Sequence, residues 1–298
     1  MNFKKMMVAV TAATLALSMV ACGSSASSSS SEKPVAEESS VTSITSESEV
    51  PTGNPEEHSL EAIKARGKLV VTTEATYPPF EFQNKNGEIV GLDASIAKAL
   101  AEDLGVELDL QNIDFKMVVA EVQAGNADIA LAGLSPTNER KKNVDMSDLY
   151  YGGGQVMLVL EENVEKFSTK ESLASATIAT QKGAIQETLM TEQFPDSKPL
   201  LLPKFPQCVQ ELKTGGADAV MIDEESAKNY MKTTPGLAIG KVAVETNPEE
   251  NGNAAAVMKG NQELLDWVNE KLAEYSESGK IQEWYDAALA EAEAAGVI

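Results

Sequence analysis

The sequence predicts an α/β protein with two lobes. From about residue 60 onward, short runs rich in β-branched residues alternate with amphipathic helical windows, a pattern typical of mainly parallel sheets. Residues 122–128 and 212–218 each contain the end of a helix, a glycine turn and the start of a strand with Asp, so one supersecondary unit occurs twice. Roughly 240 residues belong to this region, more than one hydrophobic core usually serves. We therefore expect one such unit in each lobe.

The first half of this region contains regular helical and strand patterns. Apolar residues spaced three and four apart over Leu92–Leu104 predict a helix that ends at Gly105. A second helix is expected at 116–124, closed by Gly125. Strands are expected at 68–72, 106–110 and 128–132.

The second half repeats this alternation and then returns to the first lobe. The β-like runs 155–160 and 240–246 are candidate crossovers between the lobes. Gly152, Gly153 and Gly154 lack the spacing of a phosphate-binding loop, so we interpret them as a flexible hinge near a crossover. The strand at 253–258 and two final helices complete the first lobe, which we expect to comprise 59–153 plus 247–298, with 154–246 forming the second. Strands are expected at 177–180, 200–202 and 217–222, and helices at 184–191, 206–214 and 224–231.

The N-terminus predicts export. Lys4 and Lys5 precede an uncharged apolar stretch, 6–20, that is too short to span about 30 Å of hydrocarbon as a helix. Residues 1–21 are therefore expected to be a secretory signal peptide. The sequence Ala21-Cys22-Gly23 resembles the bacterial lipobox, which implies that Cys22 is lipidated and becomes the first residue of the mature chain. The alternative is ordinary cleavage near Ala21 and release of the protein.

Residues 22–58 are expected to form a disordered tether behind the lipid. They are almost all Ser, Thr, Glu and Pro, and such a composition cannot bury enough apolar surface to fold. The only histidine, His58, is assigned to this tether, so no histidine-based metal site or Ser-His-Asp triad is expected in the folded region. With Cys22 lipidated, Cys208 has no partner, and its apolar helical pattern indicates a buried, inert thiol.

Charge and composition limit the partners. The formal net charge is −22, which argues against nucleic-acid binding because that function requires a basic surface. We expect no metal and no cofactor, and we expect a monomer.

Six spaced motifs occur in the folded region, namely 74–82 (EATYPPFEF), 90–93 (VGLD), 114–115 (DF), 125–128 (GNAD), 134–140 (LSPTNER) and 259–269. Together they resemble the family 3 extracellular solute-binding proteins, which are the polar-amino-acid receptors of ABC importers. The resemblance covers about residues 60–285 and implies a type II periplasmic-binding-protein-like fold with a ligand cleft and a hinge. It further implies a free amino acid as ligand, an ABC transporter permease as partner and a location outside the cytoplasmic membrane.

Arg140 is the candidate for the α-carboxylate of the ligand. A guanidinium offers two parallel donors to a carboxylate, and Arg140 matches the carboxylate-binding arginine of the family. The alternative is a surface charge, since two lysines follow it. The loop-to-helix entry Gly183-Ala184-Ile185-Gln186 of the next lobe would add free backbone N–H groups, with Gly183 and Ile185 as the candidate residues.

Asp223 is the candidate for the α-ammonium group. It ends a strand at the start of a helix and matches the ammonium-binding aspartate of the family. The alternative is an ordinary helix N-cap, a position that favours Asp. The loop with Ala132, Gly133 and Ser135 should add a backbone carbonyl and the Ser135 hydroxyl.

The side chain of the ligand should meet Tyr77, Phe115 and Glu74. Tyr77 and Phe115 match family positions that pack on the ligand, although Phe115 also fits a core position. Glu74 matches a position that is acidic in cation-preferring members, which favours lysine, arginine or ornithine. Cystine and glutamine remain open alternatives.

Two other classes of function were weighed against an importer receptor. The same fold carries cyclohexadienyl dehydratases, but their prephenate-like substrates need no ammonium clamp, so we expect no enzymatic activity. A sensory receptor is the third class, and this chain shows no signalling domain that could transmit a signal alone.

Overall fold

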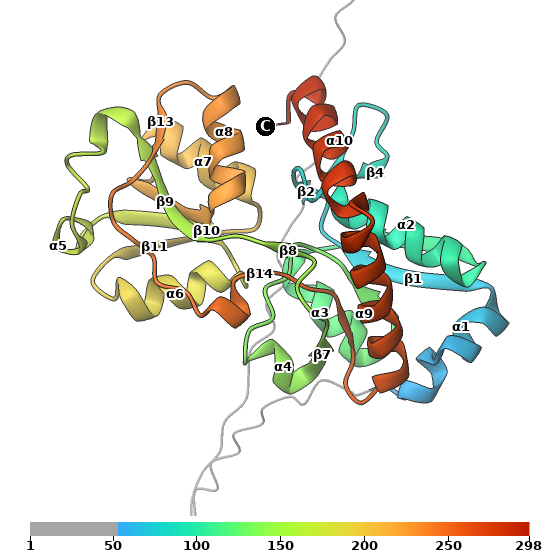
Figure 1. The fold of residues 1–298 in the computed structure, drawn as a ribbon. Helices are drawn as coiled ribbons and strands as arrows, with labels where there is room; N and C mark the ends of the chain where they lie inside the picture. Colours follow the sequence, from blue (N-terminus) through green and yellow to red (C-terminus); the bar gives the residue numbers. More distant parts are fainter. Residues whose placement is uncertain (1–52, 298) are drawn as a thin grey trace, which may run out of the picture. The chain divides into compact units, whose positions relative to one another are not determined.

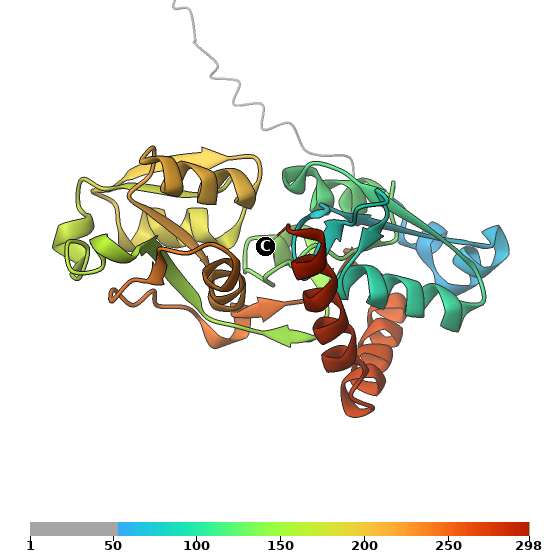
Figure 2. The ribbon, with the colours of Figure 1, turned by 90° about the horizontal axis from the view of Figure 1, so that it is seen from above.

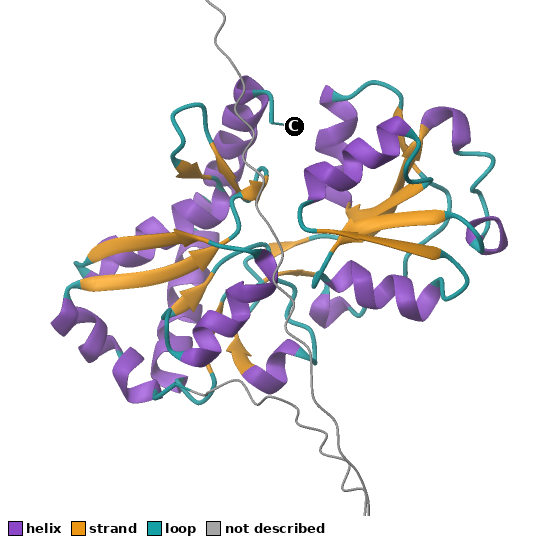
Figure 3. Ribbon diagram, turned by 180° about the vertical axis from the view of Figure 1, so that it is seen from behind, coloured by secondary structure: helices purple, strands orange, loops and turns teal. Residues whose placement is uncertain are grey.

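The structure is a computed structural model that describes residues 53–297. Two five-stranded sheets, each with helices on both faces, organise these residues into two lobes (Figures 1 and 3). The predicted signal peptide, Cys22 and most of the predicted tether lie outside the described residues. None of the helices between residues 53 and 297 has the length and apolar character needed to cross a membrane.

The first sheet has the strand order β5-β1-β6-β15-β7. The strand β1 runs parallel to β5 and β6, whereas β15 runs antiparallel to β6 and β7. Because β15 comes from the C-terminal part of the chain, this late segment pairs within the first sheet. The strands are β1 (Lys68–Thr73), β5 (Glu107–Asn112), β6 (Ile129–Ala130), β7 (Val144–Met146) and β15 (Ala256–Met258).

Alternating residues of β1 pack into two hydrophobic cores, one on each face of the sheet. Leu69 and Val71 pack with α2, α9 and α10, whereas Val70 packs with α3 on the opposite face. The helix α2 has the bounds that its apolar spacing predicts, and Gly105 ends it in the left-handed conformation. The helices of this lobe are α1 (Leu60–Arg66), α2 (Leu92–Leu104), α3 (Phe115–Ala124), α4 (Arg140–Asn143), α9 (Gln262–Glu277) and α10 (Lys280–Ala295).

The second sheet repeats the plan of the first, with the order β11-β10-β12-β9-β13. Its β10 runs parallel to β11 and β12, and β9 runs antiparallel to β12 and β13.

Cys208 lies on α7 with no exposed surface, and burial raises the pKa of its thiol to about 12, as expected for an inert side chain. The strands are β9 (Gln155–Leu160), β10 (Thr177–Gln181), β11 (Lys198–Leu202), β12 (Ala219–Asp223) and β13 (Leu237–Ile239), and the helices are α5 (Lys170–Leu173), α6 (Ile185–Gln193), α7 (Phe205–Thr214) and α8 (Glu224–Thr233).

The two similar stretches of sequence have the same structure. In each, a helix ends at a left-handed glycine, Gly125 or Gly215, and the following Asp opens a strand. The Asp128 carboxylate accepts the backbone N–H of Val70 at 2.8 Å, and the Asp218 carboxylate accepts that of Thr177 at 2.9 Å. Each Asp therefore fixes the start of the neighbouring parallel strand.

The connections between the lobes differ from the prediction. The run 155–160 is β9, which belongs to the second sheet, and 240–246 forms no strand. Val242 and Val244 in that run instead pack on a hydrophobic core of the second lobe, which satisfies their side chains without strand pairing. The crossing segments are β8 (Tyr151–Gly152) and β14 (Gly252–Asn253), which pair antiparallel; Figure 2 shows them running side by side between the lobes.

The end of the predicted tether is folded, which corrects the sequence prediction. Residues Pro55–His58 form a 3-10 helix, η1, and the His58 side chain is buried, with Nδ1 2.6 Å from Asp128 Oδ1. Arg66 donates to the other oxygen of the same carboxylate. A single histidine in a polar segment belongs to no hydrophobic pattern, so the sequence alone does not predict its contact with a buried carboxylate.

A small sheet and two more short helices complete the fold. The sheet, in the order β2-β3-β4, places the segment after β1 beside the second lobe's α7. The elements are β2 (Thr76–Tyr77), β3 (Glu81–Gln83), β4 (Ile89–Val90), η2 (Glu161–Asn163) and η3 (Pro248–Glu250).

Candidate functional site

A cavity lies between the lobes, at the carboxyl ends of the parallel strands of both sheets. Such strand ends are where open α/β sheets bind ligands. The lining includes eight predicted residues, namely Tyr77, Phe115, Ala132, Gly133, Ser135, Arg140, Ile185 and Asp223. It also includes seven further residues, namely Glu81, Gln155, Gln181, Ala184, Gln186, Phe205 and Asn253.

Arg140 opens α4 and reaches from the first lobe to the second. Its two terminal nitrogens donate to the carbonyl oxygens of Ser135, at 2.8 Å, and Gly183, at 3.1 Å, and its guanidinium lies 5.5 Å from the centre of the Phe115 ring. Burial lowers the pKa of the guanidinium to about 10, so it stays charged near neutral pH. No carboxylate of the described residues lies within ion-pair distance of it, a condition that favours an anionic ligand group.

The start of α6 provides a second feature suited to an anion. Ala184 is the N-cap residue and supplies no side-chain hydrogen bond, so the first-turn N–H groups of Ile185 and Gln186 are available toward the cavity. Gly183 lies differently from its prediction. Its N–H donates to Glu187 at 2.7 Å, and its carbonyl accepts from Arg140. It does not line the cavity but a neighbouring groove, which Arg140 and Glu187 also line.

Asp223 is the N-cap of α8, one of the two interpretations that the sequence left open, and it also lines the cavity. As the N-cap of α8, it accepts the N–H of Ser226 through Oδ1 at 2.8 Å. Its Oδ2 is buried and has no partner among the described residues, and it belongs to a residue that lines the cavity. Burial is the main cause that raises the pKa of this carboxyl to about 6. A cation placed at Oδ2 would offset that cost.

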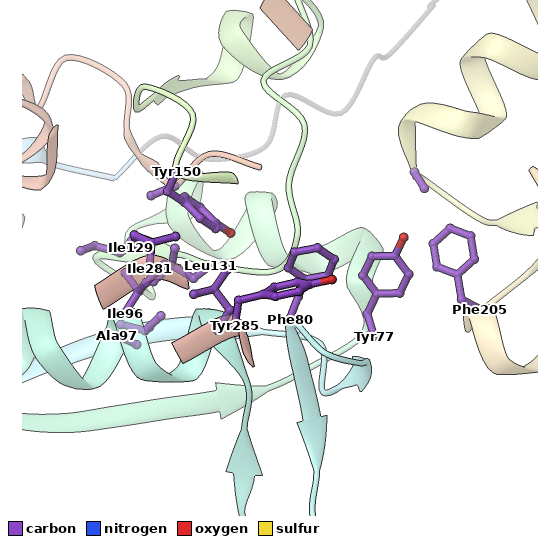
Figure 4. Close-up of a cluster of buried hydrophobic side chains, with 14 of the residues drawn as sticks. Tyr77, Phe80, Ile96, Ala97, Ile129, Leu131, Tyr150, Phe205, Ile281 and Tyr285 are labelled. Atoms are coloured by element: carbon purple, nitrogen blue, oxygen red, sulfur yellow. The ribbon is translucent and has the colours of Figure 1, made fainter. Parts of the chain in front are cut away.

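Aromatic rings form one wall of the cavity. Tyr77 stacks on Phe205 of the second lobe, with ring centres 4.7 Å apart and planes 27° apart, and on Phe80 behind it (Figure 4). The Tyr77 hydroxyl is buried and has no hydrogen-bond partner between residues 53 and 297. Phe115 is only half-buried and lines the cavity, while its ring also packs at the edge of two cores.

The loop after β6 lines the cavity with backbone and a hydroxyl. Gly133 adopts φ +56°, and a Cβ there would lie 3.3 Å from the Tyr77 ring, so the position favours glycine. Its N–H donates to Asp93 at 2.8 Å. Ala132 and Ser135 are both buried, and the Ser135 carbonyl holds Arg140.

The structure differs from the sequence prediction at Glu74. This side chain is buried but is not part of the cavity lining. Its oxygens accept from the Thr76 hydroxyl at 2.7 and 2.9 Å and from Gln181 Nε2 at 3.3 Å, and Lys204 Nζ lies 4.0 Å away. Glu74 therefore joins the first lobe to Gln181 and Lys204 of the second.

Glu81 is the carboxylate that lines the cavity, and the sequence interpretation missed it. It is 1 % exposed, its Oε2 has no partner among the described residues, and burial together with the charge of Asp93 raises its pKa well above the ordinary value. The available signal was an acidic residue between Phe80 and Phe82, because neighbours in a strand point to opposite faces.

The other missed residues are mostly amides. Gln186 donates to Gln155 at 2.7 Å inside the cavity wall, and Gln181 donates to the carbonyl of Pro203 at 2.9 Å. Gln186 stands at the start of α6, in the loop-to-helix entry that the sequence already predicts as a source of backbone N–H groups, although its side chain was not considered. Gln181 ends β10, so its strand-end position was the signal that could have found it. Phe205, at the start of α7, carried no such signal.

Known proteins resemble this chain over most of its length. The arginine-binding extracellular protein ArtP of Bacillus subtilis is 31% identical over 281 residues, covering 94% of this chain and 95% of the relative. The L-cystine-binding protein TcyJ of Escherichia coli is 30% identical, covering 76% and 86%. An amino acid ABC transporter substrate-binding protein of Streptococcus pneumoniae, solved bound to L-arginine, is 38% identical with a TM-score of 0.74, covering 78% of this chain and 97% of that one.

The family assignment follows from the sequence and agrees with the two-lobed fold. Residues 69–290 match the profile of the bacterial extracellular solute-binding proteins, family 3. This range includes both sheets and every residue that lines the cavity. The chain therefore belongs to the bacterial extracellular solute-binding proteins of family 3.

Proposed function

We propose that this protein captures a free cationic amino acid, with arginine, lysine and ornithine as the candidate ligands, and delivers it to an ABC importer. The observation that carries the proposal is the set of unpaired groups in one cavity. Arg140 has no carboxylate partner, and Asp223 Oδ2 and Glu81 Oε2 are buried without donors among the described residues. One cationic and two acidic positions match an amino acid with one carboxylate and two cationic groups.

The backbone of the ligand accounts for Arg140 and Asp223. The α-carboxylate would accept from the guanidinium of Arg140 and from the first N–H groups of α6. The α-ammonium would donate to Asp223 Oδ2 and remove the cost of a buried, unpaired carboxylate oxygen. A substrate without an ammonium group would leave that oxygen without a partner, which supports a receptor over a dehydratase.

The side chain of the ligand accounts for Glu81 and the aromatic wall. An aliphatic stem would pack on Tyr77 and Phe115, and its cationic end would reach Glu81. The names of ArtP and of the arginine-bound relative support arginine. Cystine fits less well, because its second carboxylate would lie near Glu81, and Arg140 is the one basic residue in the described lining. Glutamine would offer no cation to Glu81.

The route of the ligand completes the proposal. The protein is extracytoplasmic, and we propose that Cys22 carries the lipid that holds it to the membrane, with the residues before η1 as the tether. Lobe closure around the ligand would present both lobes to the permease. The proposed lobes are 59–153 plus 247–298, and 154–246, with the folded segment from residue 53 added to the first.

Calorimetry on the purified protein, after unfolding and refolding to remove bound ligand, tests this function. The panel contains arginine, lysine, ornithine, citrulline, glutamine and cystine, and the cationic ligands should bind at least tenfold more tightly than citrulline or glutamine, about 1.4 kcal/mol. Thermal unfolding provides a second readout, since ligand at 100 times Kd stabilises by about 2.7 kcal/mol. Absence of binding by every ligand in the panel would contradict the proposal.

A further inference from the structure

Behind Glu81, a buried network holds a second carboxylate whose oxygens are both occupied. Asp93, on α2, accepts the Tyr150 hydroxyl through Oδ1 at 2.8 Å and the Gly133 N–H through Oδ2 at 2.8 Å. Asp93 is 1 % exposed, and Tyr150 is buried among the core side chains of the first lobe (Figure 4). Two donors stabilise the charged form of a carboxyl group, so in the pair formed by Asp93 and Glu81 the negative charge resides on Asp93.

Glu81 meets the opposite conditions. No donor of the described residues reaches its buried Oε2, and the Asp93 charge lies beside it. Two buried carboxyl groups in contact do not both ionise without a nearby cation, and the better-solvated one keeps the charge. Gly133 borders both groups, because its N–H donates to Asp93 and a Cβ at this position would lie 3.6 Å from Glu81 Oε1. Since the hydrogen-bond donors all lie on Asp93, the proton of the pair is assigned to Glu81 when the cavity is empty.

We propose that Asp93 and Tyr150 keep Glu81 protonated in the empty cavity, and that a cationic ligand side chain displaces this proton when it binds. The inference rests on the proposed function, because it needs a ligand whose side chain reaches Glu81. The Glu81 O–H bond breaks, the proton passes to the buffer, and the resulting carboxylate pairs with the ligand cation. Asp93 is a positioning residue, since it does not line the cavity and affects the ligand only by holding the proton on Glu81.

The other charged groups around Glu81 agree with this assignment. Glu74, after β1, adds a further negative charge that raises the Glu81 pKa, although Lys204 partly offsets it. Across the cavity, Arg140 and Asp223 are committed to the charged backbone of the ligand in the proposed function. A neutral ligand side chain would leave the proton on Glu81, which could then donate a hydrogen bond to it. The proton on Glu81 therefore determines how strongly the cavity prefers a cationic over a neutral ligand side chain, and this preference should depend on pH.

The test compares arginine with citrulline, which has nearly the same shape and a neutral side chain. Calorimetry in buffers of different ionisation enthalpy counts the protons released per ligand bound. Both ligands should release the same fraction of a proton from Asp223, whose pKa is about 6, so the difference between them isolates Glu81. Arginine should release up to about one proton more than citrulline near pH 7, and its affinity should rise by up to about tenfold per pH unit relative to citrulline.

Three variants separate the roles. Glu81→Gln should abolish the difference in proton release and weaken arginine more than citrulline. Asp93→Asn should remove the charge that holds the proton, so the difference should shrink near pH 7 and move to lower pH while arginine still binds. Glu74→Gln is the matched control and should keep most of the difference, because Glu74 is outside the cavity lining.

Each outcome bears on a different claim. Failure of every amino acid to bind would overturn the proposed function. Equal proton release by tightly bound arginine and citrulline would overturn this inference and leave the proposed function standing. An unchanged difference in Asp93→Asn would overturn the role of Asp93. The wild-type comparison needs no variant, so it decides the main point even if Asp93→Asn does not fold.

Discussion

At the scale of single residues, the cavity is defined by polar groups that the protein itself does not satisfy. Arg140 is held by two carbonyl groups and a ring, with no carboxylate of the described residues within ion-pair distance. Asp223 uses one oxygen to cap α8 and leaves the other free. Buried polar groups without partners are costly, so their concentration in one place is best explained by a ligand that completes them.

Arg140→Lys should weaken every amino-acid ligand by more than about 2 kcal/mol, roughly 30-fold in Kd. Lysine keeps the charge but cannot offer two parallel donors to a carboxylate. Isothermal calorimetry with arginine and citrulline checks the effect, since both ligands share the α-carboxylate. Lys142→Ala, which removes an exposed charge from the same short helix, is the control and should change affinity little. Unchanged affinity in Arg140→Lys would remove Arg140 from the site.

At the scale of elements, the repeated helix-turn-strand unit is held by one aspartate in each lobe. Asp128 is fully buried and accepts from His58, Arg66 and the Val70 N–H. Asp218 is partly exposed and accepts from the Thr177 N–H, with Lys166 3.6 Å away. The same sequence position therefore holds the start of a strand in both lobes, with unequal burial.

Asp128→Ala should lower the free energy of unfolding by about 3 kcal/mol or more, because it removes the buried carboxylate that the buried His58 and the Val70 N–H contact. The matched change Asp218→Ala should cost less, since water can replace its partners. Urea unfolding followed by circular dichroism measures both. An equal loss in the two variants would contradict the idea that the His58–Asp128 contact anchors the N-terminal segment.

The helices were the most predictable elements, for a local reason. The bounds of α2 follow from apolar residues at 92, 96, 100 and 104 and from Gly105, which needs the left-handed conformation. The strand β6 is only two residues long, although five were expected at 128–132. Strand bounds depend on pairing with partners distant in sequence, so local pattern cannot define them.

At the scale of the whole molecule, the buried carboxyl groups and the net negative charge both lower the stability of the fold as pH rises. The pKa values of Asp93 and Asp223 are raised to about 6, mainly by burial. Between about pH 4 and pH 6 the folded state therefore holds protons that the unfolded state has lost, so stability falls as pH rises through this window. The net charge of −22 adds self-repulsion at higher pH.

The ligand-free protein should consequently unfold at a higher temperature near pH 5 than near pH 7.5. Each kcal/mol corresponds to about 2–4 °C in a chain of this size. Differential scanning calorimetry checks the direction, and Asp223→Asn should show a smaller difference between the two pH values because one of the buried acids is gone. A higher unfolding temperature at pH 7.5 would show that other carboxylates dominate.

The sequence by itself determined the alternation of helices and strands, the duplicated unit, and the two charged residues, Arg140 and Asp223, at the ends of their motifs. These features depend on local spacing and on short motifs. Only the tertiary structure decided which acid faces the cavity. Glu74 and Glu81 are seven residues apart on either side of a tight turn, and the pairing of β2 with β3 turns Glu81 inward while Gln181 and Thr76 engage Glu74. The burial of His58 against Asp128, 70 residues away, was decided in the same way, because such contacts depend on packing between distant segments.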